Sequence, residues 1–429
     1  MKLRKVRLGL TVGMLATILL MSACNDIEPP PMKTEKAEIH FQAFILEDRQ
    51  FKEAIEHFEE IHPEIKVIID PVSNASSDEL IDQMKGEHSP DIVAFSQLFF
   101  PAQFMDAVNQ GLVLDLQPYM DSDEIALPQS ATLHMRLKGG ANLYAIPYAA
   151  YPSAIYYNKQ LFDIAQLSYP GGDWTWELFD QLSRNLEQSS PNTIGSGLRL
   201  RYGVGQLNWL MSGSGKHIIA DDGSTFVGFL DSAEAVQAIQ WMNGYGERSR
   251  AAKVDPNDQR LTLANGSLGM KVDWIGAELG EWMKKIEVGI APMPHLEGRG
   301  RGNPSYYNYY GISSKSKSPS AAWELLKYLY LSDNQDAVNA AIEGNYVPTY
   351  EPLRDALRKQ ADETMRISID EAAYIDIASI EGSYALMRVW DPGFDGQFSG
   401  LRTVPDAELQ GRLHQLALKL DERLHKLSP

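Results

Sequence analysis

Apolar positions in the first hundred residues change between two spacings, which predicts strands and helices in alternation. Residues 39–43 are apolar at every second position, as in a half-buried strand. The segment 51–58 carries its apolar residues three or four apart, as along one face of a helix. A short apolar run at 65–69, a polar helical stretch at 77–85 and another apolar run at 91–95 follow. This order predicts an α/β unit built around a mostly parallel sheet.

Polar side chains follow the first and third predicted strands. Glu47 and Asp48 come shortly after the first strand, and Ser96 and Gln97 come directly after the third. In sheets of this kind, ligands bind beyond the carboxyl ends of the strands. On this geometry alone, we expect these four side chains to lie at a ligand site.

The later part of the chain predicts further helices and a second lobe. Helical spacing begins near Ser232, with Asp231 available as a cap, and begins again at Ser318-Pro319, where proline suits a first turn. Leucines three or four apart from 409 to 424 predict a long final helix. Because 429 residues are too many for one ordinary core, we expect two lobes.

The N-terminal segment carries an export pattern. A basic start and an apolar stretch at 8–21 precede Cys24, as in a secretory signal peptide, and the stretch is short for a membrane-spanning helix of about 20 residues. The sequence LMSAC (20–24) resembles a bacterial lipobox, in which the cysteine is lipidated and becomes the mature N-terminus. We expect a signal peptide at 1–23 and a lipidated, proline-stiffened tether at 24–36. An ordinary or uncleaved signal sequence is the alternative.

Composition and charge exclude some functions. The chain is 44% hydrophobic and 22% charged, which is typical of a folded soluble protein. Removing residues 1–23 removes four basic residues and no acid, so the formal net charge changes from −18 to −22. Nucleic-acid binding needs clustered Lys and Arg, so we expect no such partner. The single cysteine excludes an intramolecular disulfide and a cysteine metal cluster.

Nine segments carry a family resemblance through their order and spacing. They are FKEAIEHFEEIHPEIKVII (51–69), PDIVAF (90–95), GLVLDLQPYM (111–120), LYAIPYAAYPSAIYYNKQLF (143–162), TWELFDQL (175–182), ANGSLGMKVDW (264–274), VGIAPMP (288–294), SKSKSPSAAWELLKYL (314–329) and GNYVPTYEPL (344–353). Together they resemble the family 1 extracellular solute-binding proteins, the group that contains maltose-binding protein. The resemblance covers roughly residues 38–355.

The resemblance implies a two-lobed α/β fold of the periplasmic-binding-protein type. Each lobe would be a mixed sheet flanked by helices, and three crossing segments would form a hinge. Lobe 1 would comprise 37–150 with 308–346, and lobe 2 would comprise 151–307 with 347–429. The ligand would bind in the cleft between the lobes, which would close around it.

The resemblance also implies a function without catalysis. The protein would be a monomeric lipoprotein on the outer face of the bacterial cell membrane. It would capture a mono- or oligosaccharide and deliver it to the permease subunits of an ABC importer, with no cofactor and no metal. A peptide, polyol or sugar acid would use similar binding groups, so the ligand stays open.

Two alternatives to transport remain open from the residues. A secreted, lipid-anchored glycoside hydrolase needs two nearby carboxylates, and 57 Asp and Glu residues do not exclude such a pair. No G-x-S-x-G elbow and no H-x-x-x-H zinc pair occurs in the sequence. A sensory binding protein that serves a membrane receptor would look the same as a transport protein.

Sugars present apolar faces and rims of hydroxyls, so their sites combine aromatic platforms with polar groups. Trp274 lies near where the family places a sugar-stacking tryptophan, although Asp273-Trp274 stands where the family often has Gly followed by Trp. Asp273 would point to the opposite face of a regular strand. The run YYNYYG (306–311) lies near a lobe crossing, and alternation places one set of its tyrosines in the cleft.

The remaining aromatic candidates come from that run, from the first crossing and from two loops. Core packing is the alternative role for each of them. They are Tyr307, Tyr309 and Tyr310 in the run, Tyr148 and Tyr151 around the first crossing, Trp209 in a Gly/Ser-rich stretch, and Trp390 before a turn.

Overall fold

The computed structural model describes most of the chain after the expected tether. The described residues are 36–43, 52–72, 77–96, 101–132, 135–136, 140–198, 204–254, 258–274, 286–376, 379–389 and 392–427. They all belong to one compact unit, 36–429. Within these ranges, no helix has both the length and the apolar character needed to cross a membrane.

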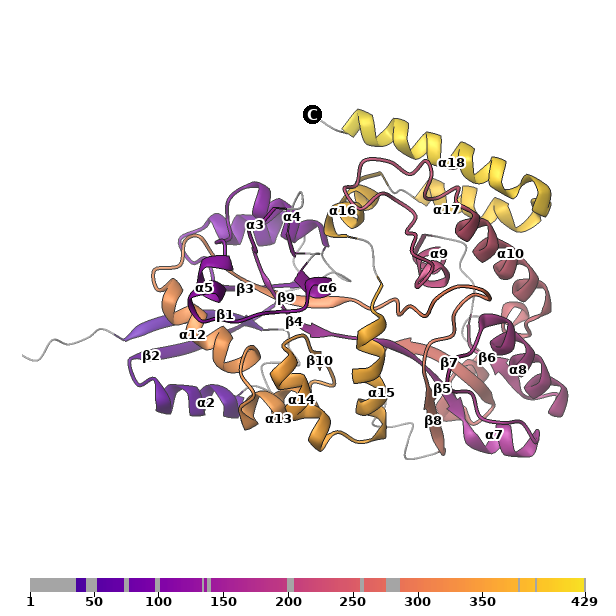
Figure 1. Ribbon diagram of the computed structural model, residues 1–429, viewed down its shortest axis with the longest axis horizontal. Helices are drawn as coiled ribbons and strands as arrows, with labels where there is room; N and C mark the ends of the chain where they lie inside the picture. Colours follow the sequence, from indigo (N-terminus) through magenta and orange to yellow (C-terminus); the bar gives the residue numbers. More distant parts are fainter. Residues whose placement is uncertain are drawn as a thin grey trace, which may run out of the picture. The chain divides into compact units, whose positions relative to one another are not determined.

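The first sheet has six strands in the order β10-β4-β9-β3-β1-β2 (Figure 1). Strand β1 pairs in parallel with both β2 and β3, whereas β9 runs antiparallel between β3 and β4. The predicted parallel unit at the start of the chain is therefore confirmed. The strands are β1 (Ala37–Ala43), β2 (Ile65–Pro71), β3 (Ile92–Ser96), β4 (Ile146–Ala150), β9 (Tyr307–Ile312) and β10 (Val347–Pro348).

The second sheet has four strands in the order β6-β7-β5-β8. Strand β5 pairs antiparallel with both β7 and β8, and β6 runs parallel to β7. The strands are β5 (Ser153–Asn158), β6 (Ile194–Ser196), β7 (Leu268–Trp274) and β8 (Val288–Ala291).

Each sheet has its own hydrophobic core, to which different helices contribute. The helices of the first core are α2 (Lys52–Ile61), α3 (Ser77–Lys85), α4 (Pro101–Asn109), α5 (Gln117–Ser122), α6 (Gln129–Thr132), α12 (Pro319–Tyr330), α13 (Gln335–Glu343), α14 (Glu351–Gln360) and α15 (Glu363–Glu371). Those of the second core are α7 (Lys159–Ile164), α8 (Trp176–Ser189), α9 (Val204–Met211), α10 (Ala233–Arg248), α16 (Ile380–Val389), α17 (Pro392–Ser399) and α18 (Asp406–Leu427). Two sheets flanked by helices confirm the predicted mixed α/β class.

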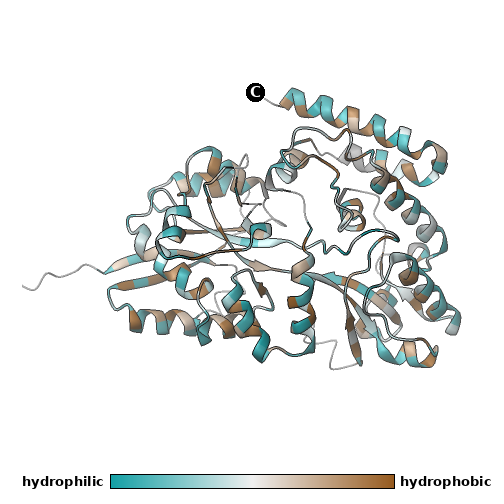
Figure 2. Cartoon of the chain, in the orientation of Figure 1, coloured by the Kyte–Doolittle hydropathy of each residue, from teal (hydrophilic) through white to brown (hydrophobic). Residues whose placement is uncertain are grey.

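Local sequence signals account for several helix boundaries. Helix α12 begins with Pro319 in its first turn, as predicted, because proline has no amide hydrogen to leave unpaired there. Helix α10 is capped by Ser232, whose hydroxyl oxygen accepts from the Ala235 amide at 3.3 Å. Asp231 was expected as this cap, but its carboxylate instead accepts from the Gly228 amide. Helix α18 buries leucines that lie three or four positions apart, as predicted, and it carries both hydrophobic and hydrophilic residues along its length (Figure 2).

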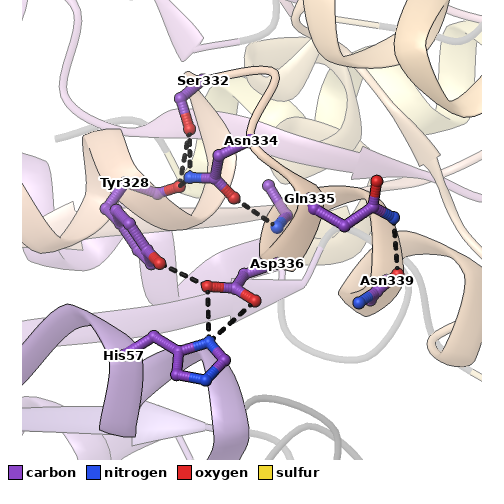
Figure 3. A network of polar contacts seen from close by, with 8 residues as sticks. His57, Tyr328, Ser332, Asn334, Gln335, Asp336 and Asn339 are labelled. Carbon is purple, nitrogen blue, oxygen red and sulfur yellow. Dashed lines mark hydrogen bonds and ion pairs between the residues drawn. The ribbon is translucent and has the colours of Figure 1, made fainter.

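A network of polar contacts joins three helices of the first core (Figure 3). Nδ1 of His57 on α2 lies 3.0 Å from both carboxylate oxygens of Asp336 on α13. The Tyr328 hydroxyl on α12 donates to the same carboxylate. The hydrogen bond that the His57 imidazole donates to the Asp336 carboxylate raises the pKa of His57 above its ordinary value. Asn334 belongs to the same network (Figure 3) and caps α13, because its side chain accepts from the Ala337 amide at 2.7 Å. The network therefore also fixes the start of that helix.

Candidate functional site

Within the described residues, the chain passes between the two cores three times. The first crossing is 151–152, between β4 and β5, and the second is 292–306, between β8 and β9. The third lies between α15 of the first core and α16 of the second, and its described residues are 372–376 and 379. The Tyr151 amide donates to the Tyr306 carbonyl at 3.1 Å, which places the first two crossing segments side by side.

Asn303 connects all three crossing segments. Its side chain is fully buried, accepts from the Ser153 amide at 2.8 Å and donates to the Ser153 carbonyl at 2.8 Å. Its backbone amide donates to the Tyr374 carbonyl, and its carbonyl accepts from the Asp376 amide. The side chain of Asn303 therefore holds the beginning of β5 against the second crossing, and its backbone holds the second crossing against the third.

A buried carboxylate completes this arrangement, which we call the Asn303 network (Asn303, Ser153, Glu371 and Arg301). Glu371 at the end of α15 accepts from Asn303 Nδ2 at 2.7 Å and from the Arg301 guanidinium at 2.5 Å. Burial raises the pKa of Glu371, and the hydrogen bonds and the arginine oppose that rise. The Arg301 guanidinium lies 3.9 Å from the centre of the Tyr374 ring, so it also contacts the third crossing.

Two glycine-rich segments pack backbone to backbone beside the Asn303 network. Gly213 has φ of +79°, and a Cβ atom there would lie 2.4 Å from the Gly300 carbonyl oxygen. A Cβ atom at Gly302 would lie 2.0 Å from the Gly213 nitrogen. The Gly213 amide donates to the Asp376 carboxylate at 2.5 Å, so this contact also includes the third crossing. Only glycine allows such close approach with this backbone conformation.

Three aromatic side chains meet where the first two crossings approach β7, and we call Tyr151, Tyr306 and Trp274 the aromatic group. The Tyr151 and Tyr306 rings stack with centroids 4.8 Å apart at an interplanar angle of 13°. Trp274 lies edge-on to Tyr306 at 6.2 Å and 85°. Trp274 is 40% exposed, whereas the two tyrosines are half-buried. A rigid aromatic surface therefore presents an indole to solvent.

Charged side chains adjoin the aromatic group. The Asp273 carboxylate forms an ion pair with Lys271 at 2.6 Å, and it also accepts from the Trp274 amide at 3.0 Å. Burial and the nearby Asp273 raise the pKa of Tyr306. Tyr306 therefore stays neutral and can act as a hydrogen-bond donor. Hydrogen-bonding groups beside an exposed indole form a surface suited to a ligand with apolar faces and hydroxyl rims.

The comparison with protein families decides the class of the protein. A family model described as "Bacterial extracellular solute-binding protein" matches residues 45–336, which is more than half of the chain. The chain belongs to this family of bacterial extracellular solute-binding proteins. The predicted resemblance is thus confirmed. Because the family consists of binding proteins, this solute-binding protein is not an enzyme, and the glycoside hydrolase alternative is wrong.

Individual relatives agree with the family in fold and in length. A protein of Brucella abortus named as a binding protein is 22% identical over 341 residues, covering 78% of this chain and 79% of the relative. The sugar-binding protein MalE from Xanthomonas citri has a TM-score of 0.71 at 16% identity, covering 91% of this chain and 98% of that one. An ABC substrate-binding protein from Listeria monocytogenes, solved in complex with cycloalternan, gives 0.68 at 17%, with 91% and 98% covered. These likenesses confirm the two-lobed fold.

Several predicted site residues of this solute-binding protein lie in its cores instead. Tyr309 is fully buried and packs edge-on against Phe104 at 5.0 Å. Tyr310 stacks on Tyr148 at 4.6 Å, and both are buried in the first core. Tyr307 is buried in the same core. Packing explains the placement of these four tyrosines, because each is at most 3% exposed.

The other predicted residues have mixed outcomes. Ser96 is fully buried and lies opposite Asn308 in the pairing of β3 with β9. Trp209 is half-buried against the second core. Tyr151 and Trp274 are members of the aromatic group, and Asp273 lies beside it. Five further predicted residues lie outside the described part of the chain: Cys24, Glu47, Asp48, Gln97 and Trp390.

Tyr306 is the member of the aromatic group that our candidate set omitted. It precedes β9 and is half-buried, whereas every residue of β9 is buried. The signal that could have found it is its position at the start of the tyrosine run, next to the crossing. Strand alternation does not apply to a residue before the strand begins.

A cavity of about 670 Å³ also lies beside the crossings, lined by residues of β10, α14 and η6 (Ala372–Tyr374) among others. This volume is in the range of small-molecule pockets. Of its two aromatic side chains, Tyr307 is buried, whereas Tyr374 is 37% exposed and has the Arg301 guanidinium over one face of its ring. Within the described ranges, no three His, Cys, Asp or Glu side chains come close enough together to hold a metal ion.

Proposed function

We propose that this solute-binding protein captures a carbohydrate at the aromatic group and delivers it to an ABC importer. The observation that carries the proposal is the exposed Trp274 indole, held edge-on to Tyr306 beside the Asp273 carboxylate. An indole offers a flat apolar surface for the C–H face of a sugar, and the carboxylate accepts hydrogen bonds from sugar hydroxyls. Delivery to an importer is supported by the Listeria protein, whose name assigns it to ABC transport.

Closure of two lobes around the ligand is part of the proposal. We propose a first lobe of 37–150 and 308–346, and we extend it to include β10, α14 and α15. The extension is supported by Leu353, Leu357 and Met365, which pack in the first core. The second lobe then comprises 151–307 and the chain from α16 onward. A ligand on Trp274 would lie against β7 of the second sheet and against the crossing segments. Its affinity would therefore depend on the angle between the lobes.

The proposal is tested with a panel of mono- and oligosaccharides together with a sugar acid, a polyol and a short peptide. We expect one class of neutral saccharide to raise the melting temperature, because a ligand at 100 times its Kd adds about 2.7 kcal/mol of stability. Binding would be checked by calorimetric titration, with one site per chain. Stabilisation by the peptide or the sugar acid alone would contradict the carbohydrate assignment.

We also propose that Cys24 is lipidated and anchors the monomeric protein to the outer face of the cell membrane. The proposal is supported by the export pattern before Cys24 and by the family, whose members are extracellular. In bacteria fed a labelled fatty acid, we expect label on the wild-type protein and none on Cys24→Ala. Equal labelling of the two proteins would exclude this anchor. Light scattering on unlipidated protein should give the mass of one chain.

A further inference from the structure

Helices α4 and α16 touch although they belong to different cores. Helix α4 contributes Phe104 and Met105 to the first core, whereas α16 contributes Ala385 and Val389 to the second. The two helices are neighbours (Figure 1). Contacts between the cores therefore exist at a place other than the crossing segments.

Helix α16 is firmly attached to the second core. The Ser379 hydroxyl before it donates to the Asp221 carbonyl. A Cβ atom at Gly223 would lie 2.8 Å from the Glu381 carbonyl oxygen, so the loop around 223 packs directly on the helix backbone. Helix α16 also packs along α18. We therefore expect α16 to move with the second lobe.

Tyr384 reaches from α16 to the first core. Its half-buried ring packs against that core, and its hydroxyl donates to Asp106 Oδ1 on α4 at 2.9 Å. The Arg388 guanidinium lies 5.7 Å from the centre of the ring. A tyrosine hydroxyl bound to a carboxylate is a charge-assisted hydrogen bond, which is stronger than a neutral one.

We propose that the Tyr384–Asp106 contact holds the two lobes together and sets their angle before any ligand binds. Tyr384 is thus a positioning residue, which acts through lobe closure without touching the ligand. The Asn303 network fixes the crossing segments, so rotation about them would move α16 relative to α4 and break this hydrogen bond. The effect on ligand affinity rests on the proposed function, whereas the effect on the lobe angle does not.

The contact should change affinity through the population of the closed state. If only the closed arrangement binds tightly, the apparent Kd is the intrinsic Kd divided by the closed fraction. Loss of a hydrogen bond to a charged group then lowers that fraction, and we expect about a tenfold weaker affinity. The ligand contacts themselves stay unchanged.

The lobe angle can be measured without a ligand by pulsed electron spin resonance. The full chain with Cys24→Ser would carry spin labels at Asp82→Cys on α3 and Arg412→Cys on α18, two exposed positions on helices of different cores. We expect Tyr384→Phe to shift the distance distribution to longer values while keeping the ring. Asp106→Ala should give the same shift, and the double variant should shift no further than either single one.

Tyr169→Phe is the matched control. The Tyr169 hydroxyl donates to Asp163 at 2.8 Å, and Asp163 lies in α7, a helix of the second core. This variant loses the same kind of hydrogen bond within one lobe, so we expect an unchanged distance distribution and an unchanged Kd. Identical distributions for wild type, Tyr384→Phe and Tyr169→Phe would overturn the proposal. If no saccharide binds at all, the proposed function fails, and the distance measurement still decides on the contact.

Discussion

Replacing Trp274 by alanine should weaken saccharide binding about thirtyfold and leave the fold almost as stable as before. Loss of an aromatic anchor at a small-ligand site costs about 2 kcal/mol of binding free energy. Trp274 is 40% exposed, so the free energy of unfolding should fall by about 1 kcal/mol or less. Calorimetric titration and a melting curve on the same variant measure the two effects, with the saccharide that stabilises the wild type most.

Trp323→Ala is the control for Trp274→Ala. Trp323 on α12 is 3% exposed and donates to Asp123 at 2.7 Å, so its loss should cost about 3–5 kcal/mol of stability. The folded fraction of this variant should bind the saccharide with the wild-type Kd. If Trp274→Ala behaves like Trp323→Ala, with low stability and unchanged affinity, Trp274 is a packing residue and the proposed platform is wrong.

Asn303→Ala should destabilise the protein by about 3–5 kcal/mol. The change leaves the Ser153 amide and carbonyl buried without their partner and removes a donor from the buried Glu371 carboxylate. Each such buried group costs about 1–3 kcal/mol. Urea unfolding followed by tryptophan fluorescence measures the loss. The distance between the labels on α3 and α18 should also become more broadly distributed, because the lost side chain joins the second crossing to the beginning of β5 and to Glu371 at the end of α15.

Asn339→Ala is the matched change outside the network. Asn339 is exposed on α13, where its side chain accepts from Gln335 at 2.8 Å. Surface changes of this kind alter stability by about 0.5 kcal/mol or less. Were the two variants to unfold at the same urea concentration, the Asn303 network would have no special part in joining the lobes.

Local patterns predicted the elements of the fold well. Alternation at 39–43 became β1, and the apolar runs near 65 and 91 became β2 and β3. These predictions succeeded because spacing reports which side of one element is buried. No local pattern shows that β9 lies between β3 and β4. That pairing joins residues more than 150 positions apart.

The site was harder to predict than the fold for a related reason. Tyr309 and Tyr310 were expected to alternate between cleft and core, but β9 is central in its sheet and buried throughout. Alternating residues along a strand distinguish a solvent-exposed face from a buried one only where one face of the sheet is exposed to solvent. Asn303 gave no signal at all, because its role depends on three segments that meet only in the folded chain.

The central position of β9 has a consequence for the order in which the protein can be made. The first 150 residues supply β1, β2, β3 and β4, yet β3 and β4 do not pair with each other, since β9 separates them. A nascent chain therefore cannot join β3 to β4 until residue 312 has been synthesised, and its first sheet is complete only with β10 at residue 348. Sheets closed by such distant segments fold slowly. Under the export predicted from residues 1–23, the chain would still be incompletely folded when it reaches the membrane, which is the state in which a polypeptide can be threaded through a membrane.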